Sequence, residues 1–310
     1  MSLAYIFPGQ GSQSPGMGKN LAENFAVARQ VFEEADEAVG FSISKMCFEG
    51  SAEELQLTEN TQPAILTVSV AAWRVMRSEG FVSPSFVAGH SLGEYSANVA
   101  AGALSLTDAV RAVRKRGKYM QEAVPVGTGA MAAVMGATVE DIERICREAA
   151  DDQICSPANI NSANQVVIAG HTEAVERATQ LLQGVAKRVV KLNVSAPFHC
   201  ALMMRAQDRL KTDLESLWFS DPEVPVIANV SATPISTGIE AREALIKQVS
   251  SPVRWLESIQ FLMSAGINTA VEIGPGKVLC GLMRQISREV KCLNVEDADS
   301  LNSSRAALTA

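Results

Sequence analysis

The chain carries the pentapeptide Gly89-His90-Ser91-Leu92-Gly93 between the strand-length apolar run Phe86-Val87-Ala88 and a helical segment that begins at Glu94. In this strand–turn–helix context, Gly-x-Ser-x-Gly is typical of a nucleophile elbow. The glycines permit a strained turn and clear space around the serine. We therefore predict that Ser91 projects its hydroxyl at a helix N-terminus, where the dipole and free N–H groups favour negative charge on a bound acyl group.

A serine hydroxyl needs a general base within hydrogen-bond reach, and the chain offers His90, His171 and His199. His90 adjoins Ser91 on the tight turn, so we expect the two side chains to diverge and His90 to be structural. His171 opens a predicted helix and is typical of a surface or capping residue. His199 lies where an inserted segment returns to the main domain, and ligands often bind at such junctions. We favour His199, although no Asp or Glu is evidently placed to orient it.

Strand-length apolar runs alternate with helical patterns on both sides of the elbow. Such runs predict strands near residues 4–7, 85–88, 224–228 and 269–273. Each of the last two ends in a turn-rich segment. This alternation indicates an α/β fold with a parallel sheet.

The middle of the chain follows a different order. Its patterns predict a strand at 130–135, a helix at 139–150, two strands on either side of 159–164, a second helix from 172, and a strand at 188–194. The order β-α-β-β-α-β is that of the ferredoxin-like split βαβ. We predict a small domain of residues 125–196, inserted into a large domain made of residues 1–124 and 197–310.

Composition excludes several classes of function. The chain has 27 Lys and Arg against 34 Asp and Glu, a net charge of −7, which disfavours general nucleic-acid binding. Its six cysteines show neither Cys-x-x-Cys nor zinc-ligand spacing, so we expect reduced thiols and no metal site. The N-terminus does not resemble a signal peptide, and no stretch approaches the roughly 18–20 apolar residues of a membrane span. We expect a cytoplasmic enzyme without a membrane partner.

The predicted helix from Thr107 to Val124 is rich in cations. Arg114 and Arg116 fall on the two flanks of its apolar stripe. From either flank, an arginine could reach an interior cleft and bind a carboxylate with its planar pair of donors. Alternatively, both arginines merely extend along the edge of the core. Periodicity leaves this choice open.

Several separated motifs together resemble malonyl-CoA:acyl carrier protein transacylases, members of the acyltransferase family of fatty-acid and polyketide synthesis. Their order and spacing match as well, from Ile6 to about Cys292. The tail from Leu301 to Ala310 lies outside the resemblance, and we expect it to be disordered. The motifs are Phe7-Pro8-Gly9-Gln10-Gly11-Ser12-Gln13, Gly89-His90-Ser91-Leu92-Gly93-Glu94, Arg116-Gly117, Pro197-Phe198-His199 and Glu272-Ile273-Gly274-Pro275-Gly276-Lys277.

The resemblance implies an α/β-hydrolase-like large domain with a ferredoxin-like insert, and a catalytic dyad of Ser91 and His199. In this family, a main-chain carbonyl orients the histidine, and the matching position is Gln248. Two backbone N–H groups form the oxyanion hole, and they fall on Gln10 and Leu92.

The resemblance also resolves the choice between the two arginines. The family arginine that binds the malonyl carboxylate precedes a glycine, and it falls on Arg116 rather than Arg114.

The implied activity is transfer of malonyl from malonyl-CoA to the phosphopantetheine thiol of acyl carrier protein, through a malonyl-serine, in fatty-acid biosynthesis. It needs no metal or diffusible cofactor, and we expect a monomer. Alternatives are a discrete polyketide-pathway acyltransferase and a serine thioesterase or esterase, which would pass the acyl group to water. A non-catalytic scaffold is disfavoured because Ser91 and His199 are both present.

Because this chain is net acidic, an acidic carrier protein would need a local basic face on which to dock. Two sets of cations are candidates: Arg111, Lys115 and Lys118, or Lys187, Arg188 and Lys191.

Overall fold

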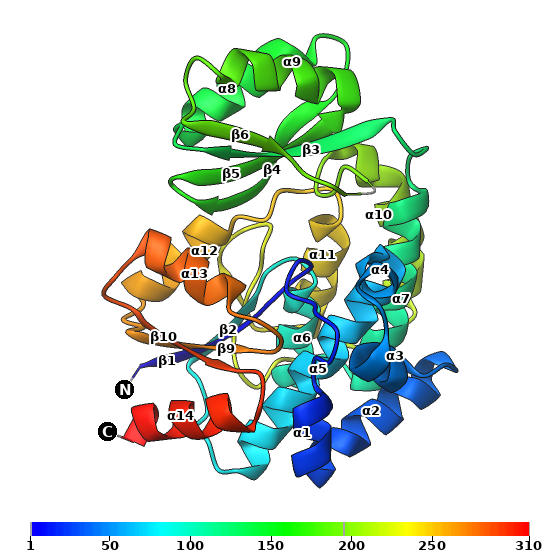
Figure 1. The fold of residues 1–310 in the computed structure, drawn as a ribbon, viewed down its shortest axis with the longest axis vertical. Coiled ribbons are helices and arrows are strands. Elements are labelled where there is room, and N and C mark those ends of the chain that lie inside the picture. Colours follow the sequence, from blue (N-terminus) through cyan, green and yellow to red (C-terminus); the bar gives the residue numbers. More distant parts are fainter. Residues whose placement is uncertain (1, 195, 310) are drawn as a thin grey trace.

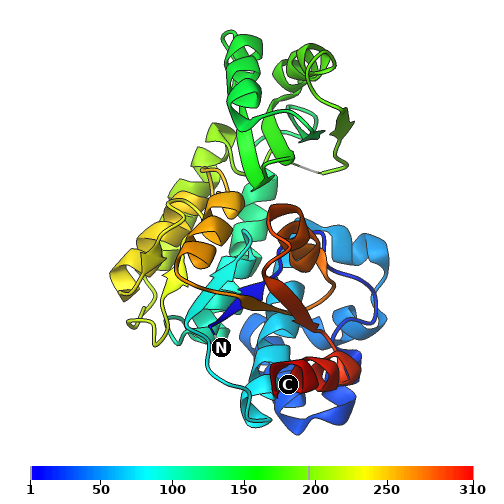
Figure 2. The ribbon, with the colours of Figure 1, turned by 90° about the vertical axis from the view of Figure 1, so that its left-hand side faces the viewer.

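The computed structural model describes residues 2–194 and 196–309, which build two parts around two separate β-sheets. Figure 1 shows the smaller part, coloured green, above the larger one, and the turned view of Figure 2 shows the same division. The predicted α/β class, with a mostly parallel sheet and an inserted small sheet, is confirmed. Ser195 and Ala310 lie outside the described residues.

The large sheet has six strands in the order β10-β9-β1-β2-β7-β8, and neighbours are parallel except β7 and β8. Its strands are β1 (Leu3–Phe7), β2 (Phe86–Gly89), β7 (Val226–Ile227), β8 (Pro234–Ile235), β9 (Thr269–Ile273) and β10 (Lys291–Val295). Its helices are α1 (Lys19–Asn24), α2 (Ala26–Val39), α3 (Ile43–Glu49), α4 (Ala52–Gln56), α5 (Thr58–Ser78), α6 (Gly93–Ala100), α7 (Leu106–Glu122), α10 (Met204–Glu215), α11 (Gly238–Gln248), α12 (Trp255–Ser264), α13 (Val278–Ile286) and α14 (Ala298–Thr309), with a short 3-10 turn, η1 (Ala201–Met203).

Strand β1 shows why the strands of the large sheet appear in the sequence as continuous apolar runs. Tyr5 and Phe7 pack into one buried core, whereas Ala4 and Ile6 pack into a second core on the opposite face, which includes Trp255 of α12. Successive side chains of a strand point to opposite faces, so a sheet covered on both sides needs apolar residues at every position.

The small sheet has the order β4-β5-β3-β6, and its paired strands are antiparallel. Figure 1 shows its two helices lying on the face directed away from the large part. This order fits the β-α-β-β-α-β pattern that the sequence predicts. The elements are β3 (Gly129–Met135), α8 (Val139–Ala150), β4 (Cys155–Ser162), β5 (Gln165–His171), α9 (Thr172–Leu182) and β6 (Arg188–Lys191).

Strand β4 differs from the prediction, because residues 159–162 continue the strand rather than forming a loop. Their polar side chains hide the strand signal. Their backbone is satisfied on both sides, with Asn159 opposite Val167 of β5 and the Ile160 N–H donating to the Val253 carbonyl at 2.9 Å. The Val253 N–H in turn donates to the Ala158 carbonyl at 2.8 Å. This pairing fastens the small sheet to the large part.

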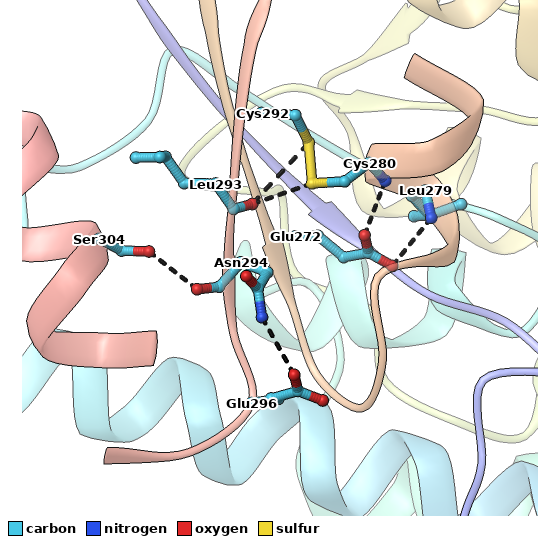
Figure 3. The surroundings of a disulfide bond; sticks show 8 residues. All are labelled: Glu272, Leu279, Cys280, Cys292, Leu293, Asn294, Glu296 and Ser304. Atoms are coloured by element: carbon cyan, nitrogen blue, oxygen red, sulfur yellow. Dashed lines mark hydrogen bonds between the residues drawn. A yellow bond between two sulfur atoms is a disulfide. The ribbon is translucent and has the colours of Figure 1, made fainter. Parts of the chain in front are cut away.

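Two further expectations are wrong. The tail forms α14 with a buried Leu301, so the described part of this segment is ordered. Cys280 and Cys292 form a disulfide between α13 and β10, so the cysteines are not all reduced. Figure 3 shows this bond beside the buried Glu272. The fold places the two Cα atoms 5.4 Å apart, a relationship that a twelve-residue separation does not reveal.

The described residues contain no helix that is both long and apolar enough to cross a bilayer.

Candidate active site

Ser91 occupies a strained turn between β2 and α6, with φ at 51°. The two flanking glycines are required by contact with neighbouring backbone. A Cβ on Gly89 would lie 2.0 Å from the Gly93 carbonyl, and a Cβ on Gly93 would lie 2.0 Å from the Phe7 carbonyl oxygen. Strained backbone of this kind persists only where surrounding structure holds it, and it is concentrated at functional sites.

The hydroxyl of Ser91 is paired with His199, whose Nε2 lies 2.7 Å from the serine Oγ. The other ring nitrogen, Nδ1, lies 2.9 Å from the main-chain carbonyl oxygen of Gln248. A carbonyl can only accept, so Nδ1 carries the ring proton and Nε2 presents its lone pair to the serine. His199 also has a positive φ, 59°. The structure thus brings the two predicted catalytic residues into the geometry of a nucleophile and its base.

Burial and the neighbouring Arg116 cation lower the pKa of His199 to about 3, against an ordinary value of 6.5. Both causes penalise the imidazolium form. The ring is therefore neutral at pH 7 and free to accept a proton from the serine.

Arg116 reaches the site from α7, with only 2% of the residue exposed. Its Nη2 lies 3.1 Å from Ser91 Oγ and 2.9 Å from Gln248 Oε1, and its Nη1 donates to Gln62 Oε1 at 2.7 Å. The guanidinium is held by neutral amide oxygens beside the nucleophile, so it can receive an anionic group.

Arg114 points elsewhere. It donates to the Glu59 carbonyl at 2.7 Å and to Asn60 Oδ1, at the start of α5. Of the two arginines that periodicity leaves open, the geometry places Arg116 beside Ser91.

The first loop lies against the elbow. A Cβ on Gly9 would approach the His90 carbonyl oxygen to 2.4 Å, so the loop and the elbow are in backbone contact. Gly9 and Gln10 line the same pocket as Ser91, and Leu92 follows the serine at the start of α6. The oxyanion roles of Gln10 and Leu92 remain predictions.

The pocket is a cavity of about 230 Å³, lined by strands of the small sheet and by loops and helices of the large part. Its floor carries the serine, histidine and arginine. Apolar side chains of the small part, such as Met131 and Leu192, form one wall, and α13 contributes Val278, Leu279 and Leu282 to another. The site therefore lies between the two parts, as the position of His199 at their junction suggests.

The other two histidines are held away from the nucleophile. The His90 Nε2 lies 2.8 Å from Asn161 Oδ1 of β4, so this side chain links the elbow to the small part. The His171 Nδ1 accepts the Ile154 N–H at 2.9 Å. Both contacts fit the structural roles that the sequence suggests.

Three functional-site residues do not emerge from the sequence reasoning: Gln62, Glu94 and Asn229. Asn229 Oδ1 accepts the Ser91 N–H at 2.7 Å, and Asn229 Nδ2 donates to the Gly89 carbonyl at 2.7 Å. Asn229 follows a predicted strand at its carboxyl end, a position where ligands bind in α/β sheets, and this was the available signal. Glu94 directly follows the elbow, whereas Gln62 lies among other polar residues at the start of α5, where nothing in the sequence distinguishes it.

Comparison with known proteins agrees with the geometry. A family model described as the acyl transferase domain matches residues 4–305. The chain is 49% identical over 285 residues to a malonyl CoA-acyl carrier protein transacylase of Salmonella typhimurium, covering 92% of each. Two solved structures are similar over nearly the whole chain. The corresponding transacylase of Coxiella burnetii has a TM-score of 0.98 at 42% identity, with 100% of this chain and 98% of that chain covered. The second, at 46% identity and a TM-score of 0.96, covering 99% and 100%, is a malonyl-transacylase in complex with a type II polyketide acyl-carrier protein.

Proposed function

Because the chain belongs to the acyl transferase family, we propose that it transfers malonyl from malonyl-CoA to the phosphopantetheine thiol of acyl carrier protein, in fatty-acid biosynthesis. It is an acyltransferase. One observation carries the proposal: Ser91 Oγ lies within 2.7 Å of a neutral imidazole and within 3.1 Å of a buried guanidinium. The first group activates the serine, and the second selects an acyl chain that ends in a carboxylate.

In the first half-reaction, His199 Nε2 takes the proton of Ser91 as the serine oxygen attacks the thioester carbon. The Ser91 N–H is occupied by Asn229. The N–H groups of Leu92 and Gln10 are the proposed donors to the oxyanion. The carbon–sulfur bond then breaks, CoA leaves with the proton from the imidazolium, and a malonyl-serine ester remains.

In the second half-reaction, the thiol of the carrier protein gives its proton to His199 and attacks the ester. Ser91 leaves as the alcohol and recovers that proton. The proposed reaction uses no metal or diffusible cofactor, because the histidine supplies the proton transfers and the amides hold the charge.

Arg116 gives the proposed selectivity. The distal carboxylate of malonyl would pair with its guanidinium in a buried site, whereas acetyl would leave the guanidinium without an anionic partner. A serine thioesterase would have no need for this residue. It would also benefit from a carboxylate behind its histidine, where this chain has the Gln248 carbonyl.

Of the two candidate faces for docking the carrier protein, we propose the one at β6, which carries Lys187, Arg188 and Lys191. This strand runs toward Leu192 and Val194, which line the pocket. The cations of α7 are engaged by other groups: Lys115 pairs with Asp213 at 2.6 Å, and Lys118 lies 3.9 Å from Glu122. On the β6 face, Lys191 pairs with Glu176 at 3.3 Å, whereas Lys187 and Arg188 form no ion pair within the described residues.

Intact-mass measurement tests the function directly. After mixing with malonyl-CoA, the wild type should gain a malonyl-sized adduct that Ser91→Ala lacks, and holo acyl carrier protein should remove it. With acetyl-CoA, the adduct should be much weaker. Loss of the adduct to water at the same rate with and without the carrier would contradict transfer. We further propose a cytoplasmic monomer, which size-exclusion chromatography and cell fractionation would test.

A further inference from the structure

Glu94 is a fully buried carboxyl one turn beyond the nucleophile, at the start of α6. One of its oxygens, Oε2, accepts two hydrogen bonds. Gln248 Nε2 donates to it at 2.7 Å, and the main-chain N–H of Asn229 donates at 3.1 Å. Burying a carboxylate is unfavourable unless such bonds compensate it. The two donors are the residues that hold the elbow and the arginine.

The first connection runs through Asn229 to the nucleophile. With its own N–H bound to Glu94, Asn229 uses both ends of its side chain on the elbow, accepting from the Ser91 N–H and donating to the Gly89 carbonyl. These bonds clamp the backbone on either side of the strained Ser91. A shift of the Glu94 carboxyl oxygen would therefore displace Asn229 and, with it, the two hydrogen bonds that hold the elbow.

The second connection runs through Gln248 to the arginine. Its Nε2 also donates to the Ser91 carbonyl at 2.9 Å, while its Oε1 accepts from Arg116 Nη2 at 2.9 Å. A flipped amide would turn its NH₂ group toward the guanidinium, so that two donors faced each other. Glu94 Oε2, together with the Ser91 carbonyl, fixes the amide orientation that leaves an oxygen for Arg116.

We propose that Glu94 is a positioning residue for acyl transfer, acting through one acceptor oxygen that simultaneously sets the Ser91 elbow and the Arg116 guanidinium. The position of this oxygen matters more than the negative charge of the carboxylate. Burial raises the pKa of Glu94 to about 7, so the neutral carboxyl is already substantially populated near neutrality. The proposal rests on the function proposed above.

Two conservative substitutions at Glu94 separate the effect of the oxygen's position from the effect of the carboxylate's charge. Glu94→Gln keeps the length and an acceptor oxygen, whereas Glu94→Asp keeps the charge and withdraws the oxygens by one methylene. We expect Glu94→Asp to lower kcat/KM for malonyl transfer at least tenfold and to reduce the preference for malonyl-CoA over acetyl-CoA. We expect Glu94→Gln to remain within about fivefold of the wild type in both measurements.

A second measurement does not depend on the acyl substrate. The labelling rate of Ser91 by an alkyl fluorophosphonate reports the serine–histidine geometry directly. It should fall in Glu94→Asp and be largely retained in Glu94→Gln. If the wild type is labelled at Ser91 but transfers no malonyl, the proposed function fails while this comparison still tests Glu94.

Glu272 provides a matched control. Its carboxyl is also fully buried, and it accepts the Leu279 and Cys280 N–H groups at 2.9 and 2.7 Å, at the start of α13 (Figure 3). Glu272→Asp should lower the melting temperature but leave the malonyl-over-acetyl preference unchanged.

Three results would overturn the proposal. The first is wild-type rates and preference in Glu94→Asp. The second is equal impairment of Glu94→Gln and Glu94→Asp. The third is an equal loss of preference in Glu272→Asp, which would mean that general destabilisation suffices.

Discussion

His199 Nδ1 lies 2.9 Å from the main-chain carbonyl oxygen of Gln248, the position where a triad would place a carboxylate. A neutral carbonyl fixes the tautomer and ring orientation but supplies no full negative charge to stabilise imidazolium. Arg116 adds a positive charge nearby, which disfavours imidazolium further. Together, the Gln248 carbonyl and Arg116 therefore make His199 a weak base whose neutral ring is always able to accept a proton, rather than a strong base that is partly protonated.

The first prediction concerns pH. Because the pKa of His199 is lowered to about 3, the imidazole stays neutral throughout the range from pH 8 to pH 5. The rate of Ser91 malonylation, measured by rapid-quench mass spectrometry in Glu94→Gln, should show no acid limb in this range. The variant removes the Glu94 carboxyl, whose pKa of about 7 would otherwise overlap. An acid limb near 6.5 in this variant would contradict the assigned environment of His199.

The same shift predicts a direction for stability. The unfolded chain binds a proton at this histidine near 6.5, whereas the folded chain does so only near 3. The unfolded state is therefore favoured increasingly as pH falls from 6.5 toward 3, and the histidine's contribution is absent above that window. His199→Gln should lessen the fall in melting temperature between pH 6.5 and 4.5. An unchanged or steeper fall would show that this group does not control it.

The second prediction concerns acyl selectivity. Arg116→Ala removes the proposed partner of the malonyl carboxylate, and breaking a buried ion pair costs roughly 3–5 kcal/mol. We expect kcat/KM for malonyl-CoA to fall by about 100-fold or more, with acetyl-CoA use spared or raised. Arg114→Ala is the matched control, because Arg114 lies two residues away on α7 and contacts Glu59 and Asn60 instead. Unchanged malonyl selectivity in Arg116→Ala would refute the assignment.

The contrast between these arginines shows what sequence could and could not supply. The elbow is predictable because its strand, turn and helix are contiguous, and each constrains the next. Arg114 and Arg116 both lie at the edge of one apolar stripe, so their roles depend on what packs against each side. Arg114 contacts the start of α5, and Arg116 contacts Ser91. A motif resemblance, rather than periodicity, selects Arg116 before the fold is known.

The supporting network could not be predicted for a related reason. Glu94 precedes Asn229 by 135 residues and Gln248 by 154, and only the fold brings it together with them. The disulfide between Cys280 and Cys292 likewise depends on α13 lying beside β10. The sequence predicts only part of strand β4, because its polar residues interrupt the apolar pattern and its pairing with β5 and Val253 becomes visible only in the fold.

The third prediction concerns the glycine at the base of the elbow. In Gly93→Ala the new Cβ would lie 2.0 Å from the Phe7 carbonyl oxygen, and β1 cannot shift without disturbing the sheet. We expect a loss of at least about 3 kcal/mol in the free energy of unfolding, or insoluble protein, by urea titration. Gly281→Ala is the control, because a Cβ there has open space within α13. It should be neutral or stabilising by up to about 1 kcal/mol. Equal stability of the two variants would contradict the contact.

The fourth prediction concerns docking of the carrier protein. Reversing charge at Lys187 and Arg188 together should raise KM for acyl carrier protein about tenfold, because an acidic partner would meet repulsion at the start of the strand that leads to the pocket. The malonyl-CoA half-reaction, which does not involve the carrier, should keep its rate. Lys118→Glu is the control on the other basic face, since this lysine already lies beside Glu122. Raising salt should weaken docking of the wild type more than that of the double variant, because screening acts on the charges removed. A larger effect from Lys118→Glu would move the docking face to α7.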